Sequence, residues 1–215
     1  MEERPIREAA AVICVRPGNP RPEVLVVERS LQSRFLPGYV AFPGGAIDPE
    51  DREHAQRWFG DSGEVQRAAA VRELIEETGL ALTAAGLVAA HPGGPFDAVD
   101  VMPPAVEQLA EMVHWIAPPD VPVRFDARYY SVSAPTGLDA TPDGVEASKA
   151  WWTSPQRLLR QWEEGRRKLY WPTWLTTQEL AACETVEEAR SLTYESRDPT
   201  DQEEATLPRS VMEQD

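Results

Sequence analysis

The sequence is poor in cysteine and has no long apolar run. Only Cys14 and Cys183 occur among its 215 residues, which is too few for a disulfide framework. Cys14 lies in an apolar strand pattern, so we expect a small buried hydrophobic side chain there. The charged N-terminus, residues 1–5, does not resemble a signal peptide, and no segment resembles a membrane span. We therefore expect a cytoplasmic protein.

Basic residues are also scarce. Lysine and arginine together number 21 against 36 acidic residues, giving a formal net charge of -15, and only two of the basic residues are lysine. This charge argues against a nucleic-acid-binding surface and against docking on anionic membranes. An acidic protein that binds an anionic substrate needs local help from metal ions and arginines.

The length predicts one domain, residues 1–194, followed by an acidic tail at 195–215 that is nearly free of apolar residues and is expected to be disordered. Within the domain, short valine-rich runs predict a hairpin formed by strands at 9–15 and 24–27. Further patterns predict strands at 39–42 and 123–132, a strand or turn at 81–90, helices at 51–59, 99–113, 155–164 and 173–182, and another turn at 186–192.

The most informative stretch is Arg72-Glu73-Leu74-Ile75-Glu76-Glu77-Thr78-Gly79-Leu80. An alanine-rich approach favours a helix, and Gly79 is suited to end it. On that helix the three glutamates share one face, within an arc of about 100°. Crowded carboxylates repel one another unless a cation lies on them, and hard oxygen ligands suit Mg²⁺ or Mn²⁺. The alternative is a solvated acidic surface.

This stretch resembles the core of the Nudix box, G-x5-E-x7-R-E-U-x-E-E-x-G-U, in which U is apolar. Glu64 precedes Arg72 at the required spacing, whereas Trp58 occupies the usual place of the opening glycine. Gly45, in Phe42-Pro43-Gly44-Gly45, is the better candidate for that glycine. Eighteen residues then separate Gly45 from Glu64 where the motif has five, which indicates a 13-residue insert within residues 46–63.

The resemblance implies an α/β (α+β) Nudix fold, a mixed curved sheet sandwiched between helices. It also implies a hydrolase that cleaves a nucleoside diphosphate linked to another group. The Gly45 carbonyl, Glu73, Glu76 and Glu77 would hold Mg²⁺ or Mn²⁺, and Arg72 would orient the carboxylates. Glu64 would lie in the outer shell or join the metals. The general base would be one of these glutamates or Glu146, which follows a turn; Asp143 competes with it, and ordinary turn chemistry is the alternative for both.

A second resemblance concerns substrate. Members of the coenzyme A diphosphatase branch show an element that this chain matches at Arg29-Ser30, Arg34, Gly38, Phe42-Pro43-Gly44-Gly45 and Asp48, with departures at Glu28 and Ser33. The resemblance implies coenzyme A or its thioesters as substrate and Arg29 and Arg34 as binding residues. ADP-ribose, nicotinamide dinucleotides, damaged nucleotides and a non-catalytic nucleotide-binding regulator remain alternatives, and a homodimer remains open.

The predicted strand at 123–132 carries Arg124, Asp126 and Arg128 on one side, because side chains alternate along a strand. The two arginines are candidate ligands of an anionic substrate near the metal-binding face. The alternative is a set of cross-strand ion pairs.

Overall fold

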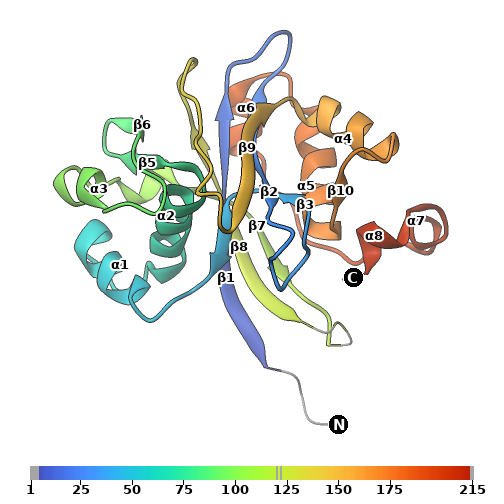
Figure 1. Cartoon of the computed structure of the whole chain (residues 1–215), viewed down its shortest axis with the longest axis horizontal. Coiled ribbons are helices and arrows are strands. Elements are labelled where there is room, and N and C mark those ends of the chain that lie inside the picture. Colours follow the sequence, from blue (N-terminus) through green and yellow to red (C-terminus); the bar gives the residue numbers. More distant parts are fainter. Residues whose placement is uncertain (1–4, 120, 122, 214–215) are drawn as a thin grey trace.

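The computed structural model describes residues 5–213, apart from residues 120 and 122. Its centre is a mixed, curved sheet in which the strand order is β10-β3-β2-β1-β8-β7, with β4 also paired to β1 and β9 to β2 (Figure 1). The strands of this sheet are β1 (Ile6–Arg16), β2 (Glu23–Arg29), β3 (Tyr39–Ala41), β4 (Gly44–Ala46), β7 (Ala110–Ile116), β8 (Arg124–Ser133), β9 (Ala147–Thr153) and β10 (Lys168–Leu169).

The pairing of β1 organises the sheet. At one end it forms the predicted antiparallel hairpin with β2, with Val15 opposite Val24. Along its whole length it runs parallel to β8, and on its other edge Ala10 lies opposite Gly45 of β4. The strands predicted at 9–15, 24–27, 39–42 and 123–132 are all present. The pairing of β4 brings the Gly44-Gly45 segment against the middle of β1.

Helices cover both faces of the sheet, which confirms the predicted sandwich (Figure 1). In the described part of the chain, no helix is both long and apolar enough to cross a membrane. One side carries α1 (Asp51–Phe59), α2 (Val65–Thr78), α3 (Asp97–Val101) and a two-stranded sheet, β5 (Leu80–Thr83) with β6 (Gly86–Ala89); the other side carries α4 (Pro155–Glu163), α5 (Trp171–Ala182), α6 (Val186–Ser191), α7 (Asp201–Thr206) and α8 (Arg209–Met212).

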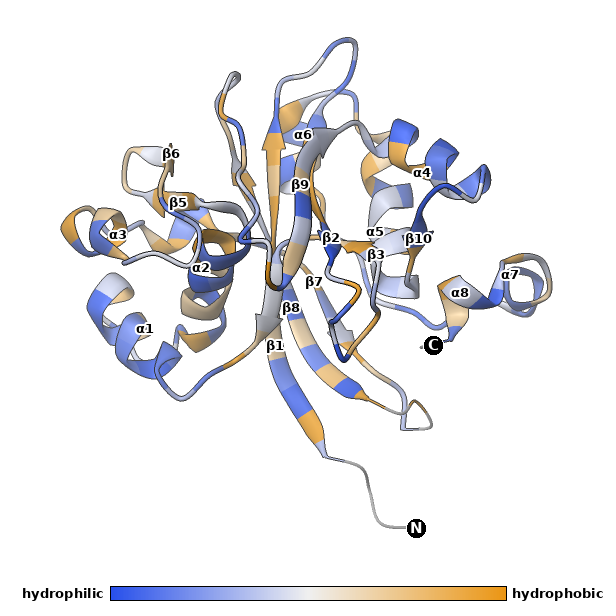
Figure 2. Ribbon diagram, viewed as in Figure 1, coloured by the Kyte–Doolittle hydropathy of each residue, from blue (hydrophilic) through white to orange (hydrophobic). Residues whose placement is uncertain are grey.

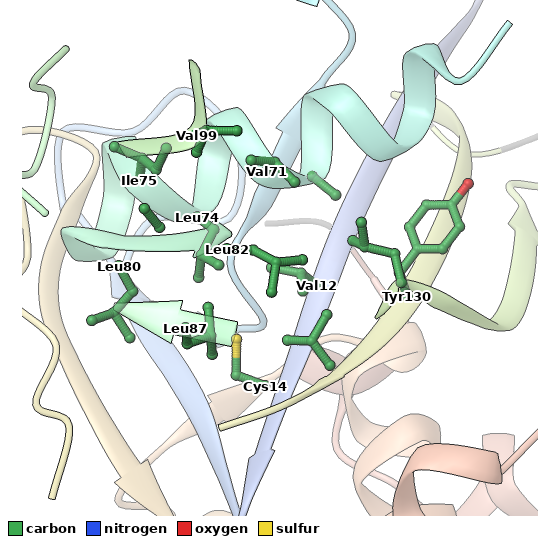
Figure 3. Close-up of a cluster of buried hydrophobic side chains, with 14 of the residues drawn as sticks. Val12, Cys14, Val71, Leu74, Ile75, Leu80, Leu82, Leu87, Val99 and Tyr130 are labelled. Carbon is green, nitrogen blue, oxygen red and sulfur yellow. The ribbon is translucent and has the colours of Figure 1, made fainter. Parts of the chain in front are cut away.

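Two hydrophobic cores fill the spaces between the layers. In the first, Val71, Leu74 and Ile75 of α2 pack against Val12 and other residues of the sheet (Figure 3). The second core lies on the opposite face, beneath α4, α5 and α6. Odd and even residues of the central strands therefore serve different layers, and the alternation of polar and apolar residues is visible along β8 (Figure 2). Cys14 is fully buried in the first core, as expected.

The helix predicted at 99–113 is wrong. The structure has the short α3, a single 3-10 turn at Val106–Gln108, and then the strand β7. Pro103 and Pro104 prevent a continuous helix, because proline lacks the N–H and restricts the residue before it. The buried residues Met112, Val113 and Trp115 instead pack on the second core as part of a strand paired to β8.

The C-terminal segment also differs from the expected disordered tail. Residues 201–212 contain α7 and α8, and Thr200 caps α7 by accepting a hydrogen bond from the backbone N–H of Glu203 at 3.3 Å. Val211 is fully buried in the second core. The sequence did not indicate this buried contact of Val211, because a single valine among many polar residues gives little signal of burial.

Candidate active site

The helix α2 positions the acidic residues. Its alanine-rich first half packs tightly on the sheet, and its backbone ends at Gly79, whose φ is 62°. This left-handed conformation is readily adopted by glycine, and the Gly79 N–H donates to the carbonyl of Ile75 at 2.9 Å. With Leu74 and Ile75 in the core, Glu73 and Glu77 are turned toward β4.

Glu73, Glu77 and Glu146 form a carboxylate cluster. One carboxylate oxygen of each lies within 4.8 Å of the others, and no other acidic, histidine or cysteine group of the described residues joins them at this spacing. Glu73 and Glu77 are 7% and 2% exposed, whereas Glu146 is open to solvent. Asp143 does not join the cluster; its carboxylate accepts hydrogen bonds from the backbone N–H groups of Glu146 and Ala147, at 3.0 and 2.8 Å.

Two glycines let β4 approach the cluster. The backbone N–H of Gly44 donates to Glu77 at 3.0 Å. At Gly45, a Cβ atom would lie only 2.2 Å from a carboxylate oxygen of Glu73, so any side chain would displace that glutamate. The close packing brings Gly45 beside the carboxylates, which is where the sequence predicted a carbonyl ligand.

Arg72 lies buried beneath the cluster and holds acids from two helices. Its Nη1 donates to Glu73 at 2.9 Å and to Glu76 at 2.8 Å. Its Nε and Nη2 donate to the two carboxylate oxygens of Asp51, at 2.8 and 3.0 Å. Asp51 is fully buried in α1, within the insert. No pattern in the sequence indicated this role, because an acid in the first turn of a helix is ordinary.

Burial and mutual repulsion perturb the acids strongly. Burial raises the pKa of Glu77 to about 8, and the charge of Glu73 adds to the rise. Burial likewise raises the pKa of Glu73 to about 7, although Arg72 acts in the opposite direction. For Arg72 itself, burial opposes the charged form, but the hydrogen bond to Asp51 and the nearby carboxylates raise its pKa above the ordinary value. The cluster is thus rich in negative charge that this protein neutralises only in part.

The other two box acids are not part of this close group, although Glu76 shares the Nη1 of Arg72 with Glu73. Glu76 is half-buried, and its carboxylate is paired with Arg72. Glu64 precedes α2 and pairs with Arg67, whose guanidinium stacks over Tyr130. Glu64 lies nine positions before Glu73, which is about 13 Å along the helix axis. The structure therefore brings Glu146 to the buried glutamates and leaves Glu64 at the far end of the helix.

A cleft of about 580 Å³ opens beside the cluster, with Glu73, Glu146 and Gly45 on its wall. Three of the alanines that line it, Ala9 of β1, Ala46 of β4 and Ala127 of β8, lie side by side in the sheet and form an alanine floor with little side-chain bulk. Aromatic rings also line it, among them Phe35, Trp115, Phe125, Tyr129, Tyr170 and Trp171.

Of the predicted substrate-binding arginines, Arg29 lines the cleft. Its Nε donates to the carbonyl of Phe35 at 3.0 Å, and its charge acts on Glu77. Arg34 is exposed on the following loop and is not among the residues that line the cleft.

Arg124 and Arg128 project from the other face of β8. Odd-numbered residues of β8, including Phe125 and Tyr129, line the cleft, whereas Tyr130 packs with the first core. Arg128 pairs with Glu111 across the β7–β8 ladder, at 2.7 Å, and Arg124 donates to the carbonyl of Ala117. The shared side expected for these arginines is correct, but this side faces away from the cleft.

Comparisons with known proteins identify the family of this fold. A family model for the NUDIX domain matches residues 5–171. A crystal structure of a NUDIX hydrolase from Alicyclobacillus acidocaldarius is 30% identical and superposes with a TM-score of 0.74, covering 88% of this chain and 97% of that one. An Escherichia coli K12 protein named as an uncharacterized Nudix hydrolase, NudL, is 35% identical over 119 residues, which are 55% of this chain and 50% of NudL. The match thus spans about half the length of that relative.

Proposed function

Because this chain belongs to the Nudix family, we propose that it is a metal-dependent hydrolase that cleaves a nucleoside diphosphate linked to another group. The observation that carries the proposal is the meeting of Glu73, Glu77 and Glu146 within 4.8 Å of one another at the wall of a cleft. Two of these carboxylates are buried, and a buried set of acids is unfavourable without a cation to balance it.

The donor set fits a hard divalent cation. Mg²⁺ and Mn²⁺ prefer carboxylate and carbonyl oxygens; Glu73, Glu77 and Glu146 offer carboxylates in one place, and the carbonyl of Gly45, which packs against Glu73, would add a further ligand. When bound, the metal ions neutralise charge on the diphosphate and lower the pKa of a coordinated water. We propose that either Mg²⁺ or Mn²⁺ binds at this site and that the Gly45 carbonyl is one of its ligands.

The surrounding residues have distinct parts in the proposed reaction. Arg72 fixes the orientation of Glu73 and Glu76 by charge-assisted hydrogen bonds, and Asp51 fixes Arg72. Glu146 is exposed beside the two buried glutamates, so it is our first candidate to accept a proton from the attacking water. Arg29 lies at the same end of the cleft and is suited to bind a phosphate oxygen.

Coenzyme A and its thioesters are our leading substrates. The element from Arg29 to Asp48 supports this choice, and the cleft volume of about 580 Å³ leaves room for more than a diphosphate. ADP-ribose and nicotinamide dinucleotides contain the same diphosphate group and are the alternatives within the enzyme class. A regulator that binds nucleotides without cleaving them is the alternative outside it.

A substrate panel with Mg²⁺ or Mn²⁺, analysed by mass spectrometry, tests the proposal. We expect coenzyme A to yield adenosine 3′,5′-bisphosphate and phosphopantetheine, and we expect a chelator to abolish turnover. Cleavage of another diphosphate would keep the chemistry and reject the coenzyme A assignment. Thermal shifts with nucleotides but no product would reject the enzyme and favour the regulator.

A further inference from the structure

We infer that Arg197, in the C-terminal segment, is a specificity-determining residue that binds a second anionic group of the substrate, remote from the diphosphate. This inference rests on the proposed function. Ser196, Arg197 and Asp198 line the same cleft as Glu73 and Glu146. They lie outside residues 5–171, the part of the chain that matches the NUDIX domain. The wall they form is therefore an addition to the shared domain.

The segment is a fixed part of the cleft. The indole N–H of Trp171 donates to the carbonyl of Arg197 at 2.9 Å, and the guanidinium of Arg197 lies over the Trp171 ring, 5.3 Å from its centroid. Farther along, Val211 is fully buried in the second core and anchors α8. Since both the backbone and the side chain of Arg197 contact Trp171, the cation is held at the wall before any ligand arrives.

The guanidinium is also oriented from its other side. Its two terminal nitrogens donate to the two carboxylate oxygens of Glu203, at 2.7 and 2.8 Å. Glu203 is itself held by Thr200, whose backbone N–H and hydroxyl donate to it at 2.9 and 2.8 Å. The Arg197 side chain remains 44% exposed, so an incoming anion can approach it. Glu203 thus fixes the direction of the cation without burying it.

The position of Arg197 defines the ligand. Two of the three glutamates of the cluster come from α2 on one side of β1, and the C-terminal helices α7 and α8 lie on the other side (Figure 1). Between them the cleft is lined by the alanine floor, Ala9, Ala46 and Ala127, and by aromatic rings. A substrate that spans the cleft would place its diphosphate at the cluster, an apolar portion over the alanines, and a second anion at Arg197. Phosphate monoesters suit such a cation because they carry strong negative charge and can accept from the guanidinium N–H groups that Glu203 does not use.

Two substrate pairs that differ by one phosphate monoester test the inference. They are coenzyme A with 3′-dephospho-coenzyme A, and the reduced nicotinamide dinucleotide with its 2′-phosphate. We expect the protein to prefer the phosphorylated member of at least one pair in kcat/KM, chiefly through KM. In Arg197→Ala that preference should fall about 10-fold, the size expected for one charge-assisted hydrogen bond, and Arg197→Lys should restore part of it.

The matched control is Arg209→Ala. Arg209 belongs to the same segment, carries the same charge, is exposed and does not line the cleft, so its loss should leave both members of each pair unchanged. Equal losses for both members in Arg197→Ala, or a preference that depends instead on Arg7, which also lines the cleft, would overturn the inference.

The outcome is separable from that of the proposed function. Hydrolysis of either unphosphorylated compound supports the enzyme whatever Arg197 does. If none of the four compounds is cleaved, calorimetric titration of the same pairs still compares the phosphorylated and unphosphorylated ligands. A Kd ratio that Arg197→Ala leaves unchanged would then reject the role of Arg197 on its own.

Discussion

Two acidic regions of this chain use glutamate in opposite ways. On α2, Glu73 and Glu77 are buried against each other, and burial raises the pKa of both. On α7, Glu203 lies in an open region rich in acids, and its hydrogen bond with Arg197 lowers its pKa to about 2. The first region holds more buried negative charge than its arginines balance, whereas Glu203 in the second is matched to one cation.

A high density of acidic residues alone therefore does not identify a metal site. A charged helix face that is solvated and paired, as on α7, contributes a little stability and demands no ligand. A buried cluster of carboxylates without enough positive partners lowers the stability of the fold, and a bound cation would offset that loss. Burial of the carboxylates and the number of nearby positive charges distinguish a metal site from a solvated acidic surface. Of these two quantities, only the number of positive charges can be judged in part from the sequence.

The strongest test of this difference is Glu77→Gln against Glu203→Gln. We expect Glu77→Gln to lower metal-dependent turnover on the order of 10³-fold, because loss of a metal ligand removes several kcal/mol of charge stabilisation. In a chelator above about pH 8, where Glu77 of the wild type is ionised, the same variant should unfold at a higher temperature than wild type, since a buried carboxylate has been replaced by an uncharged amide. Retained turnover in a folded Glu77→Gln protein would contradict the proposed site.

Asp51→Ala tests a buried acid that is fully paired. We expect a loss of about 3 kcal/mol in the free energy of unfolding, because Arg72 keeps its buried charge but loses the carboxylate that binds it in two places. Urea denaturation measures the change. Substitution of the exposed neighbour Glu53 by alanine is the control and should change stability little. Equal effects of the two variants would mean that Asp51 does not hold Arg72.

The pH dependence of metal-free stability follows from the sign of the pKa shifts. Because the pKa values of Glu73 and Glu77 are raised in the folded state, to about 7 and about 8, folding takes up protons above pH 4.5. The stabilisation is complete below about pH 4.5 and is lost as pH rises toward 8. Thermal unfolding in a chelator should therefore show a falling Tm across this window, and Mg²⁺ should raise Tm most at the alkaline end. A Tm that is flat in chelator, or falls equally in Glu77→Gln, would contradict this account.

Glu203→Gln should have the smallest effect. The pair with Arg197 is exposed, so its loss should lower the free energy of unfolding by less than about 1 kcal/mol at neutral pH. The sign with pH is the reverse of that for the cluster: the lowered pKa of Glu203 gives stability above about pH 4.5 that is lost as pH falls toward 2. Chemical denaturation at neutral and acidic pH measures both effects. A loss comparable to that of Asp51→Ala would show that the C-terminal segment is stabilised mainly by this pair.

The sequence predicted the elements that carry strong local signals. Gly60 and Gly79 mark the ends of α1 and α2, and Ser154 caps α4 by accepting from the Arg157 N–H at 3.3 Å. Glu146 was a candidate on the family resemblance; it lies beside Glu73 and Glu77, and its role stays a prediction. Local signals suffice where a residue's conformation is decided by its neighbours in the chain.

Features that depend on long-range register were missed. Alternation put Arg124 and Arg128 on one side of a strand, but only the pairing of β8 with β1 and β7 decides which side faces the cleft. The contact between Asp51 and Arg72 joins residues that are 21 positions apart, and no periodic pattern in the sequence predicts it. The contribution of Ser196, Arg197 and Asp198 to the cleft likewise depends on how a remote segment packs.

The hydrogen-bonded ion pair between Asp51 and Arg72 couples the insert to the Nudix box, so we expect these two positions to change together in evolution. A related protein without the insert would lack Asp51, the acceptor for Arg72. It would need another acid in contact with Arg72 to keep that buried guanidinium paired. Among relatives of this chain we therefore expect an acid at the position of Asp51 wherever an insert of this length occurs. Where the loop is short, we expect a replacement acceptor, and engineered chimaeras that exchange this loop should be made with the two positions together.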